Sequence, residues 1–71
     1  LNAKNAIAHT ATVYIPIPPA RSDTGKVTMT LQERFVELDA LTDSPSAIPT
    51  GTLVQVVRVT DQGVLVVRPM G

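Results

Sequence analysis

Apolar and polar residues alternate along the first half of this chain, with a period that is typical of strands. Every second residue is aliphatic from Val13 to Ile17, from Val27 to Leu31 and from Val36 to Ala40. A period of two places the aliphatic side chains on one face of an extended backbone. The pattern predicts strands at residues 11–17, 25–31 and 35–41.

Two valine-rich runs, residues 52–59 and 64–68, flank a short polar turn in the second half. β-Branched runs of this length, separated by turn residues, predict a β-hairpin. The alternation slips where Val56 and Val57 are adjacent, and such a change of phase is typical of a β-bulge. We expect Gly63 to take the left-handed conformation in the hairpin turn.

Five short strands with no room for a long helix predict an all-β fold, a small five-stranded antiparallel barrel over residues 11–69. Closing the sheet removes valine-rich edges that would otherwise aggregate. The strand order is OB-fold-like, and an SH3-like barrel is the alternative. Because the chain begins at Leu1 instead of methionine, we expect residues 1–10 to be a lead-in or linker from a longer parent chain.

The phase of each strand predicts which side chains fill the barrel. In the third strand the aliphatic face should point inward, because Glu37 and Asp39 on the other face would be costly to bury unpaired. Phe35 then lies on the outer face beside these acids. Ile48 is the one apolar anchor of the long loop after this strand. The predicted core residues are Val13, Ile15, Val27, Met29, Leu31, Val36, Leu38, Val54, Val56, Leu65 and Val67.

Prolines stiffen the connection between the first two strands. Pro16, Pro18 and Pro19 lack backbone donors and favour an extended, rigid loop. The spacing of Pro16 and Pro19 would also suit a proline-binding partner, but a rigid loop is the favoured interpretation. The segment Ser22–Gly25 that follows has turn chemistry, and Gly25 is free to take a positive φ.

The residue composition offers no catalytic or metal-binding set. The 71 residues make one domain, without cysteine and therefore without disulfides or thiolate ligands. His9 is the only histidine, whereas a zinc site needs three or four ligands. Ser44 and Ser46 have no base in their own loop, so a nucleophilic set is not expected. We expect no enzymatic activity, no catalytic residue, no metal and no cofactor.

Charge and aromatic content argue against a nucleic-acid partner. Six basic residues balance six acidic ones, so the chain has no net positive charge that would attract a polyanion. OB-fold modules that bind single strands combine stacking aromatics with a basic groove, and Tyr14 and Phe35 are the only aromatics. A nucleic-acid-binding module is nevertheless the alternative function. A biotin- or lipoate-type carrier is disfavoured because Lys26 begins a strand instead of occupying a hairpin tip.

Four segments together resemble the C-terminal soluble domain of NfeD-like bacterial membrane proteins. The pattern is a glycine-led strand, an acidic strand, a Pro-x-Gly-Thr entry into an alternating valine strand, and a Leu-x-Val-x-Pro exit. It covers about residues 11 to 69, and the family usually has a glycine near His9 that this chain lacks. The segments that carry the resemblance are Gly25–Val27, Val36–Ala40, Ile48–Val59 and Leu65–Pro69.

The resemblance implies a function as well as a fold. NfeD-like proteins have membrane helices followed by an OB-fold domain, and they are commonly paired with stomatin- or flotillin-type (SPFH) proteins. The implied function is a non-enzymatic protein-interaction domain that acts in membrane organisation. It would be held at the inner or cell membrane by its parent protein and lie in an aqueous compartment, on the cytoplasmic side.

A neutral interaction domain should bind through an exposed apolar or mixed patch, because charge cannot drive its association. Outward-facing strand positions and the proline loop supply the candidates. The candidate protein-contact residues are Tyr14, Pro18, Pro19, Phe35, Val64 and Val66.

Overall fold

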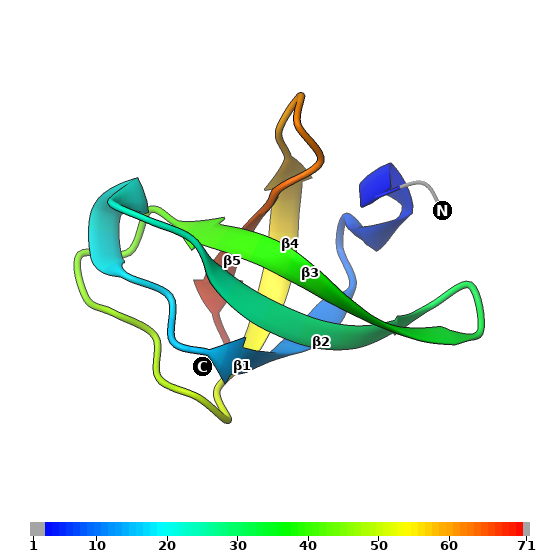
Figure 1. Cartoon of the computed structure of the whole chain (residues 1–71), viewed down its shortest axis with the longest axis horizontal. Helices are drawn as coiled ribbons and strands as arrows, with labels where there is room; N and C mark the ends of the chain where they lie inside the picture. The colour runs from blue at the N-terminus through cyan, green and yellow to red at the C-terminus, as the bar shows by residue number, and fades with distance from the viewer. Residues whose placement is uncertain (1–2, 71) are drawn as a thin grey trace.

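Five strands form a closed barrel in the computed structural model, which describes residues 3–70 (Figure 1). Two short 3-10 turns, η1 (Ala3–Ala6) and η2 (Pro19–Arg21), lie before and after the first strand. The strands are β1 (Thr10–Ile15), β2 (Gly25–Leu31), β3 (Arg34–Thr42), β4 (Leu53–Val59) and β5 (Leu65–Pro69).

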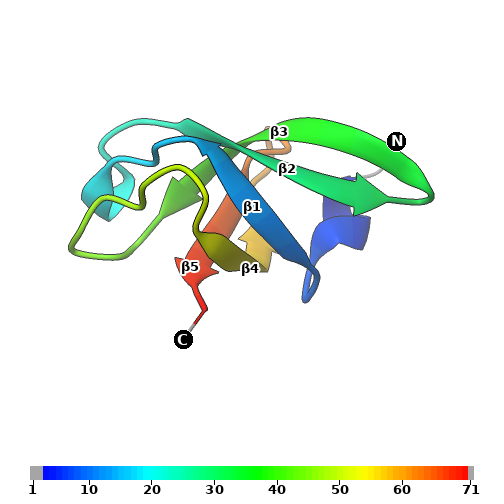
Figure 2. The same ribbon diagram turned by 90° about the horizontal axis from the view of Figure 1, so that it is seen from below.

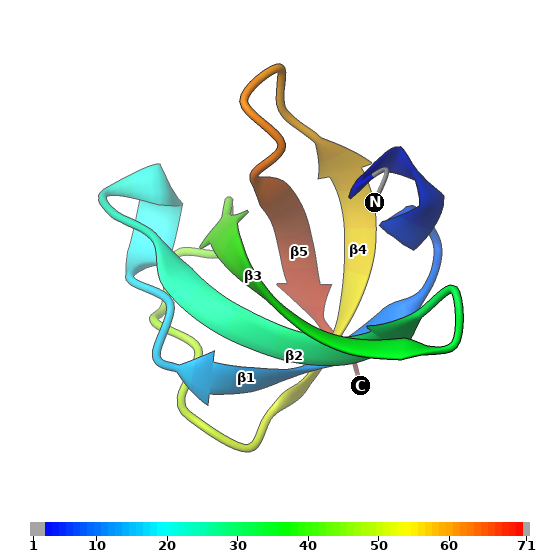
Figure 3. The ribbon, with the colours of Figure 1, turned by 45° about the vertical axis from the view of Figure 1, so that its right-hand side comes forward.

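The strand order around the barrel is β1-β2-β3-β5-β4, and β4 pairs with β1 to close it. The β3–β5 pairing is parallel, and the other four pairings are antiparallel. The β2–β3 hairpin is long and curved, and it extends past the rest of the barrel (Figure 3). This architecture confirms the prediction of an all-β, OB-fold-like barrel of five strands, while the parallel β3–β5 pairing corrects the expectation that all of its pairings are antiparallel.

Inward-facing aliphatic side chains fill the barrel, largely as the strand phases predict. Val36 and Leu38 are half-buried and pack against the central cluster. The long loop contributes Ile48, which is 2% exposed, so its predicted anchoring role is confirmed. The predicted core residues that are buried are Val13, Val27, Met29, Leu31, Val54, Val56, Leu65 and Val67.

The prediction for Ile15 is wrong, because its side chain is 43% exposed. The β1–β2 register pairs Val13 with Val27 but Ile15 with Lys26, so Tyr14 is an extra residue on β1. A bulge of one residue reverses the phase of the alternation beyond it. Ile15 therefore turns outward. Ile17 lies beyond the end of β1, where it is fully buried and bridges to Ile48.

The second bulge lies where the sequence predicts it, in β4. Val56 pairs with Val67 and Arg58 with Val66, which leaves Val57 without a partner on β5. Gly63 has a φ of +81°, so its predicted left-handed conformation is also confirmed.

Val66 was expected to face outward and be exposed, but it is 1% exposed. Its register partners are Leu41 on β3 and Arg58 on β4. Side chains at paired positions lie on the same face of a sheet, so both neighbours flank Val66. This outer position is nevertheless buried, which corrects the expectation of exposure.

The segment before β1 packs onto the barrel instead of fraying. Ala6 in η1 is fully buried. The Ala8 N–H donates to the Val56 carbonyl, and the Val56 N–H donates to the His9 carbonyl, each at 2.9 Å. Ala8 has a φ of 72°, so alanine takes a left-handed conformation in the turn where the resembling family usually has glycine. Leu1 and Asn2 lie outside the described residues.

The proline loop is fixed to the loop after β3, at one end of the barrel (Figure 2). The Ala20 N–H donates to the Ser44 carbonyl at 2.9 Å, and Ile17 and Ile48 exchange backbone hydrogen bonds. Gly25 follows this loop with a φ outside the left-handed region, contrary to the turn expectation. A Cβ there would lie 2.5 Å from the Pro16 carbonyl oxygen, so glycine is required for space.

Among residues 3–70, no helix is long and apolar enough to cross a bilayer.

Candidate functional site

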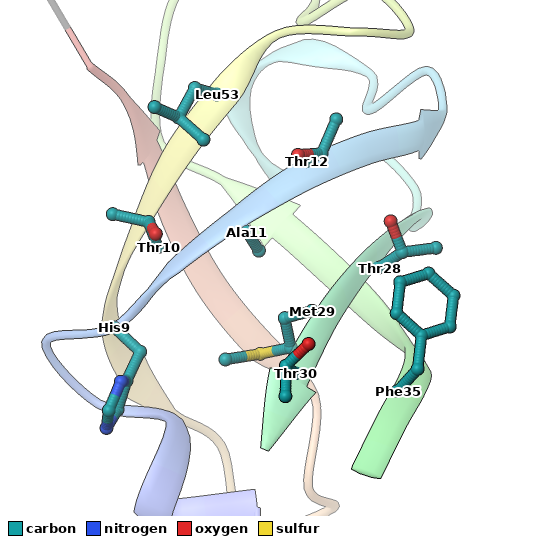
Figure 4. Close-up of a pocket in the computed structure, with 9 residues that line it drawn as sticks. All are labelled: His9, Thr10, Ala11, Thr12, Thr28, Met29, Thr30, Phe35 and Leu53. Atoms are coloured by element: carbon teal, nitrogen blue, oxygen red, sulfur yellow. The ribbon is translucent and has the colours of Figure 1, made fainter. Parts of the chain in front are cut away.

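An open groove of about 350 Å³ lies over β1 and the second half of β2 (Figure 4). Residues from the start of β3 and β4 complete its walls. The groove also includes His9, which immediately precedes β1. The lining residues are His9, Thr10, Ala11, Thr12, Thr28, Met29, Thr30, Phe35 and Leu53.

Four threonines supply most of the polar surface of the groove. Thr10 and Thr12 alternate with inward-facing residues on β1, and Thr28 and Thr30 do the same on β2. Thr12 and Thr28 are direct register partners across the two strands. Their hydroxyls can each donate and accept hydrogen bonds, so this surface can bind polar groups without adding charge.

Apolar side chains form the floor and two sides of the groove. Ala11 and Met29 lie between β1 and β2 and are only 3% and 4% exposed. Phe35 is 76% exposed on the β3 side, and Leu53 is 49% exposed on the β4 side. Figure 4 shows these two side chains on opposite sides of the threonines. Exposed apolar groups in this arrangement are typical of a contact surface.

The described lining residues include no lysine, arginine, aspartate or glutamate. The charged side chains that do pair lie elsewhere. Lys26 Nζ donates to Asp39 Oδ1 at 2.7 Å, and this hydrogen bond raises the pKa of Lys26 above its ordinary value. The surface presented by the groove is therefore polar but uncharged, apart from whatever charge His9 carries.

A second ion pair holds the proline loop against β3. Arg21 donates through both Nε and Nη2 to the Asp43 carboxylate, at 2.5 and 3.2 Å. These hydrogen bonds lower the pKa of Asp43 below its ordinary value. A lowered folded-state pKa means that the pair contributes at neutral pH and is lost as acid protonates Asp43. Arg21 therefore has a structural role and does not line the groove.

The structure does not bring the predicted contact residues into one patch. Phe35 lies at the groove, and Tyr14 is 55% exposed at the β1 bulge. The others are covered to different extents at separate places: Pro18 and Pro19 are half-buried beside η2, Val64 is half-buried before β5, and Val66 is buried.

The threonines and Leu53 were not predicted as site residues. The alternation of threonine with aliphatic residues was visible in the sequence, and it correctly places threonine on the outer face. What the sequence does not show is that β1 and β2 leave a groove between them. That arrangement depends on pairing between strands far apart in the chain.

No group of three or more histidine, aspartate or glutamate side chains is placed to hold a metal ion in the described part of the chain. Likewise, among residues 3–70 no hydrogen bond joins the His9 ring to a threonine hydroxyl.

No protein-family model matches the chain, and no curated protein sequence matches it either. Solved structures do match. The soluble domain of the NfeD protein YuaF from Bacillus subtilis is 25% identical, with a TM-score of 0.67 over 87% of this chain and 70% of that one.

Two further structures share the fold. One is the soluble domain of a Corynebacterium glutamicum membrane protein implicated in regulation of membrane protease activity. It is 18% identical, with a TM-score of 0.69 over 93% of this chain and 94% of that one. The other is the C-terminal domain of stomatin operon partner protein 1510-C from Pyrococcus horikoshii. It is 20% identical, with a TM-score of 0.66 over 93% of this chain and 89% of that one.

These likenesses confirm, at the level of the fold, the resemblance inferred from the sequence. The barrel has the fold of the soluble domains of NfeD-like proteins.

Proposed function

We propose that this NfeD-like barrel is a non-enzymatic protein-interaction domain of a membrane-anchored parent protein. The observation that carries the proposal is the neutral groove with Phe35 exposed at its side. The Phe35 side chain is 76% exposed, and covering it with a partner would lower the free energy because burying apolar surface is favourable. The described groove lining beside Phe35 includes no lysine or arginine, which favours a protein surface over a polyanion as the partner.

The proposed partner is an SPFH protein of the stomatin or flotillin type. Support comes from the Pyrococcus horikoshii domain, which belongs to a protein named as a stomatin operon partner. The three structures named above are soluble domains or C-terminal domains, and two of them come from a membrane protein and an NfeD protein. In this proposal the parent lies in the cell membrane, and the barrel faces the cytoplasm and helps to organise the membrane.

Photo-cross-linking of the full-length protein in its own cells tests this function. A photoreactive phenylalanine analogue replaces Phe35, and the same analogue replaces Gln62 on the β4–β5 turn as a control. We expect a covalent adduct from position 35 that mass spectrometry identifies as an SPFH protein, and none from position 62.

Further positions separate the function from the location of its contact surface. The same analogue is placed in turn at Tyr14, Pro18 and Val64. An SPFH adduct from one of these positions, but not from Phe35, would support the function and move the contact surface. Absence of an SPFH adduct from all of them and from Phe35 would overturn the proposed function.

A further inference from the structure

The groove lies where the barrel wall is incompletely paired. The β1–β2 register contains Thr12 with Thr28, Val13 with Val27 and Ile15 with Lys26, and it includes no pair nearer the start of β1. From Thr10 to Thr12, β1 pairs with β4 on its other edge, while β2 continues to Leu31 paired with β3. The two strands therefore diverge, and each has one edge free of the other beside the groove.

On β2, the free edge is at Thr30. The Gln32–Glu33 turn joins paired residues Leu31 and Arg34, which makes a two-residue hairpin loop. Such a loop is closed by a hydrogen-bonded pair, and in an antiparallel ladder the next pair is not hydrogen-bonded. The next pair is Thr30 with Phe35. The N–H and C=O of Thr30 therefore point away from β3 and toward β1.

On β1, the matching free edge is at Thr10. The carbonyl of His9 accepts from Val56 on β4, and Val13 donates to Thr52 and accepts from Gly51. Odd-numbered residues of β1 thus direct their backbone groups toward β4. Before the bulge at Tyr14, even-numbered residues direct theirs toward β2, where Thr12 has Thr28 as its partner but Thr10 has none in the register.

The side chains around these free edges favour one class of ligand. Free N–H and C=O groups of a strand are satisfied most fully by another extended backbone. The threonine hydroxyls beside them are uncharged, and Phe35 and Leu53 offer apolar contacts on opposite sides. A lysine- or glutamate-rich segment would lose hydration on entering and gain no ion pair from the described lining residues.

We infer that the groove is a strand-addition site, in which an extended, uncharged segment of a partner protein pairs with the free edge of β2 at Thr30. This inference rests on the proposed function and specifies its binding mode. The inserted strand receives backbone hydrogen bonds from Thr30, and alternate apolar side chains on it contact Phe35 and Leu53. Because the edge is recessed in a groove, it is less open to indiscriminate strand pairing than an outer edge would be.

A peptide titration followed by NMR tests the inference directly. The probe is a capped, neutral five-residue peptide of alternating valine and threonine, added to the ¹⁵N-labelled chain. We expect amide shifts at Thr10, Thr30 and Phe35, and slower hydrogen exchange of the Thr30 amide. The same peptide N-methylated at alternate residues should bind at least about tenfold more weakly, the equivalent of about one lost hydrogen bond.

Protein variants distinguish binding through backbone hydrogen bonds from nonspecific hydrophobic binding of the peptide. Thr30→Pro removes the N–H that faces the groove and should weaken peptide binding about tenfold. Proline is tolerated at an unpaired strand edge. Phe35→Ala should weaken binding, whereas Tyr14→Ala, which changes an exposed aromatic outside the groove lining, should not. If Thr30→Pro fails to fold, the N-methylated peptide still tests the same hydrogen bond from the ligand side.

Several results would overturn the inference. These are an absence of peptide-induced shifts in the groove, equal binding of the N-methylated peptide, or concentration-dependent shifts at Thr30 without peptide, which would assign the edge to a second copy of this chain. The cross-linking experiment keeps the proposals distinct. If SPFH adducts form only from Tyr14, Pro18 or Val64, the proposed interaction function is supported. The inference that the groove is the binding site is then contradicted.

Discussion

At the scale of single residues, Gly25 is a position where the barrel has no room for a side chain. An added Cβ would lie 2.5 Å from the Pro16 carbonyl oxygen and 2.6 Å from that of Ile15. Both neighbours are backbone atoms, so neither can move aside by changing a rotamer. The close approach of two chain segments, and not an unusual φ, is what requires glycine here.

Gly25→Ala should therefore lower the free energy of unfolding by about 1–3 kcal/mol, the usual cost of overpacking. Urea denaturation followed by circular dichroism measures the change. Gly51→Ala is the matched control, because Gly51 has a φ of +92° but no atom within 4 Å of an added Cβ. It should show the cost of backbone strain alone, and unchanged stability of Gly25→Ala would contradict the proposed close contact.

At the scale of elements, the β2–β3 hairpin is built with a turn that its residues do not favour. Gln32 and Glu33 have φ values of 52° and 63°. Two consecutive positive φ values define the type I′ turn, which strongly prefers Asn-Gly. This hairpin presents both Thr30 and Phe35, so its turn positions the proposed site without contacting a ligand.

Replacing the turn with Gln32→Asn and Glu33→Gly should raise the free energy of unfolding by about 1–2 kcal/mol, since the left-handed region costs ordinary residues about 1–2 kcal/mol each and the replacements relieve part of that cost at both positions. Thermal melts should then shift upward by about 4–8 °C per kcal/mol for a domain of this size. Gln62→Asn, in a turn residue without positive φ, is the control and should leave the melting temperature unchanged. A lower melting temperature for the double variant would contradict the turn assignment.

The elements themselves could be predicted from the sequence, because alternation and turn chemistry are local. The β4 bulge was visible as adjacent Val56 and Val57. The β1 bulge at Tyr14 was not, because no change in residue type accompanies it. It is defined by pairing with Lys26 on another strand, and it explains why Ile15 is exposed.

The candidate site was predicted less completely than the fold. Phe35 was identified because its neighbours Glu37 and Asp39 required an outward face for that side of β3. The backbone groups of Thr10 and Thr30 are free for a ligand only because the β1–β2 ladder ends before it reaches them. Where a ladder ends depends on the strand register, which the sequence does not show. Val66 was misplaced as well, because a period of two assigns it to the outer face but does not show that this position is buried in the folded chain.

At the scale of the whole molecule, stability rests on one aliphatic cluster without disulfides. Leu65 is fully buried there, on the strand that lies between β3 and β4. Domains of this size bury a smaller share of their surface than larger ones, so they have little stability to spare.

Leu65→Ala should lower the free energy of unfolding by about 2–5 kcal/mol, through lost burial and an unfilled cavity. Chemical denaturation measures the loss, and a large fraction of the variant should be unfolded at 37 °C. Leu53→Ala makes the same chemical change at a side chain that is 49% exposed, and it should cost much less. Equal losses from both variants would contradict the assigned core.

The closing contact of the barrel also affects how fast the chain can fold. Thr12 pairs with Leu53, and Ala40 pairs in parallel with Leu65, so two of the five ladders join segments distant in sequence. Closing a long loop costs chain entropy before the contacts that it brings together stabilise the fold. Proteins dominated by such long-range contacts fold in milliseconds to seconds. On a ribosome, β1 must therefore wait for β4 to emerge before it gains that partner, and its apolar side chains are exposed to chaperones during that interval.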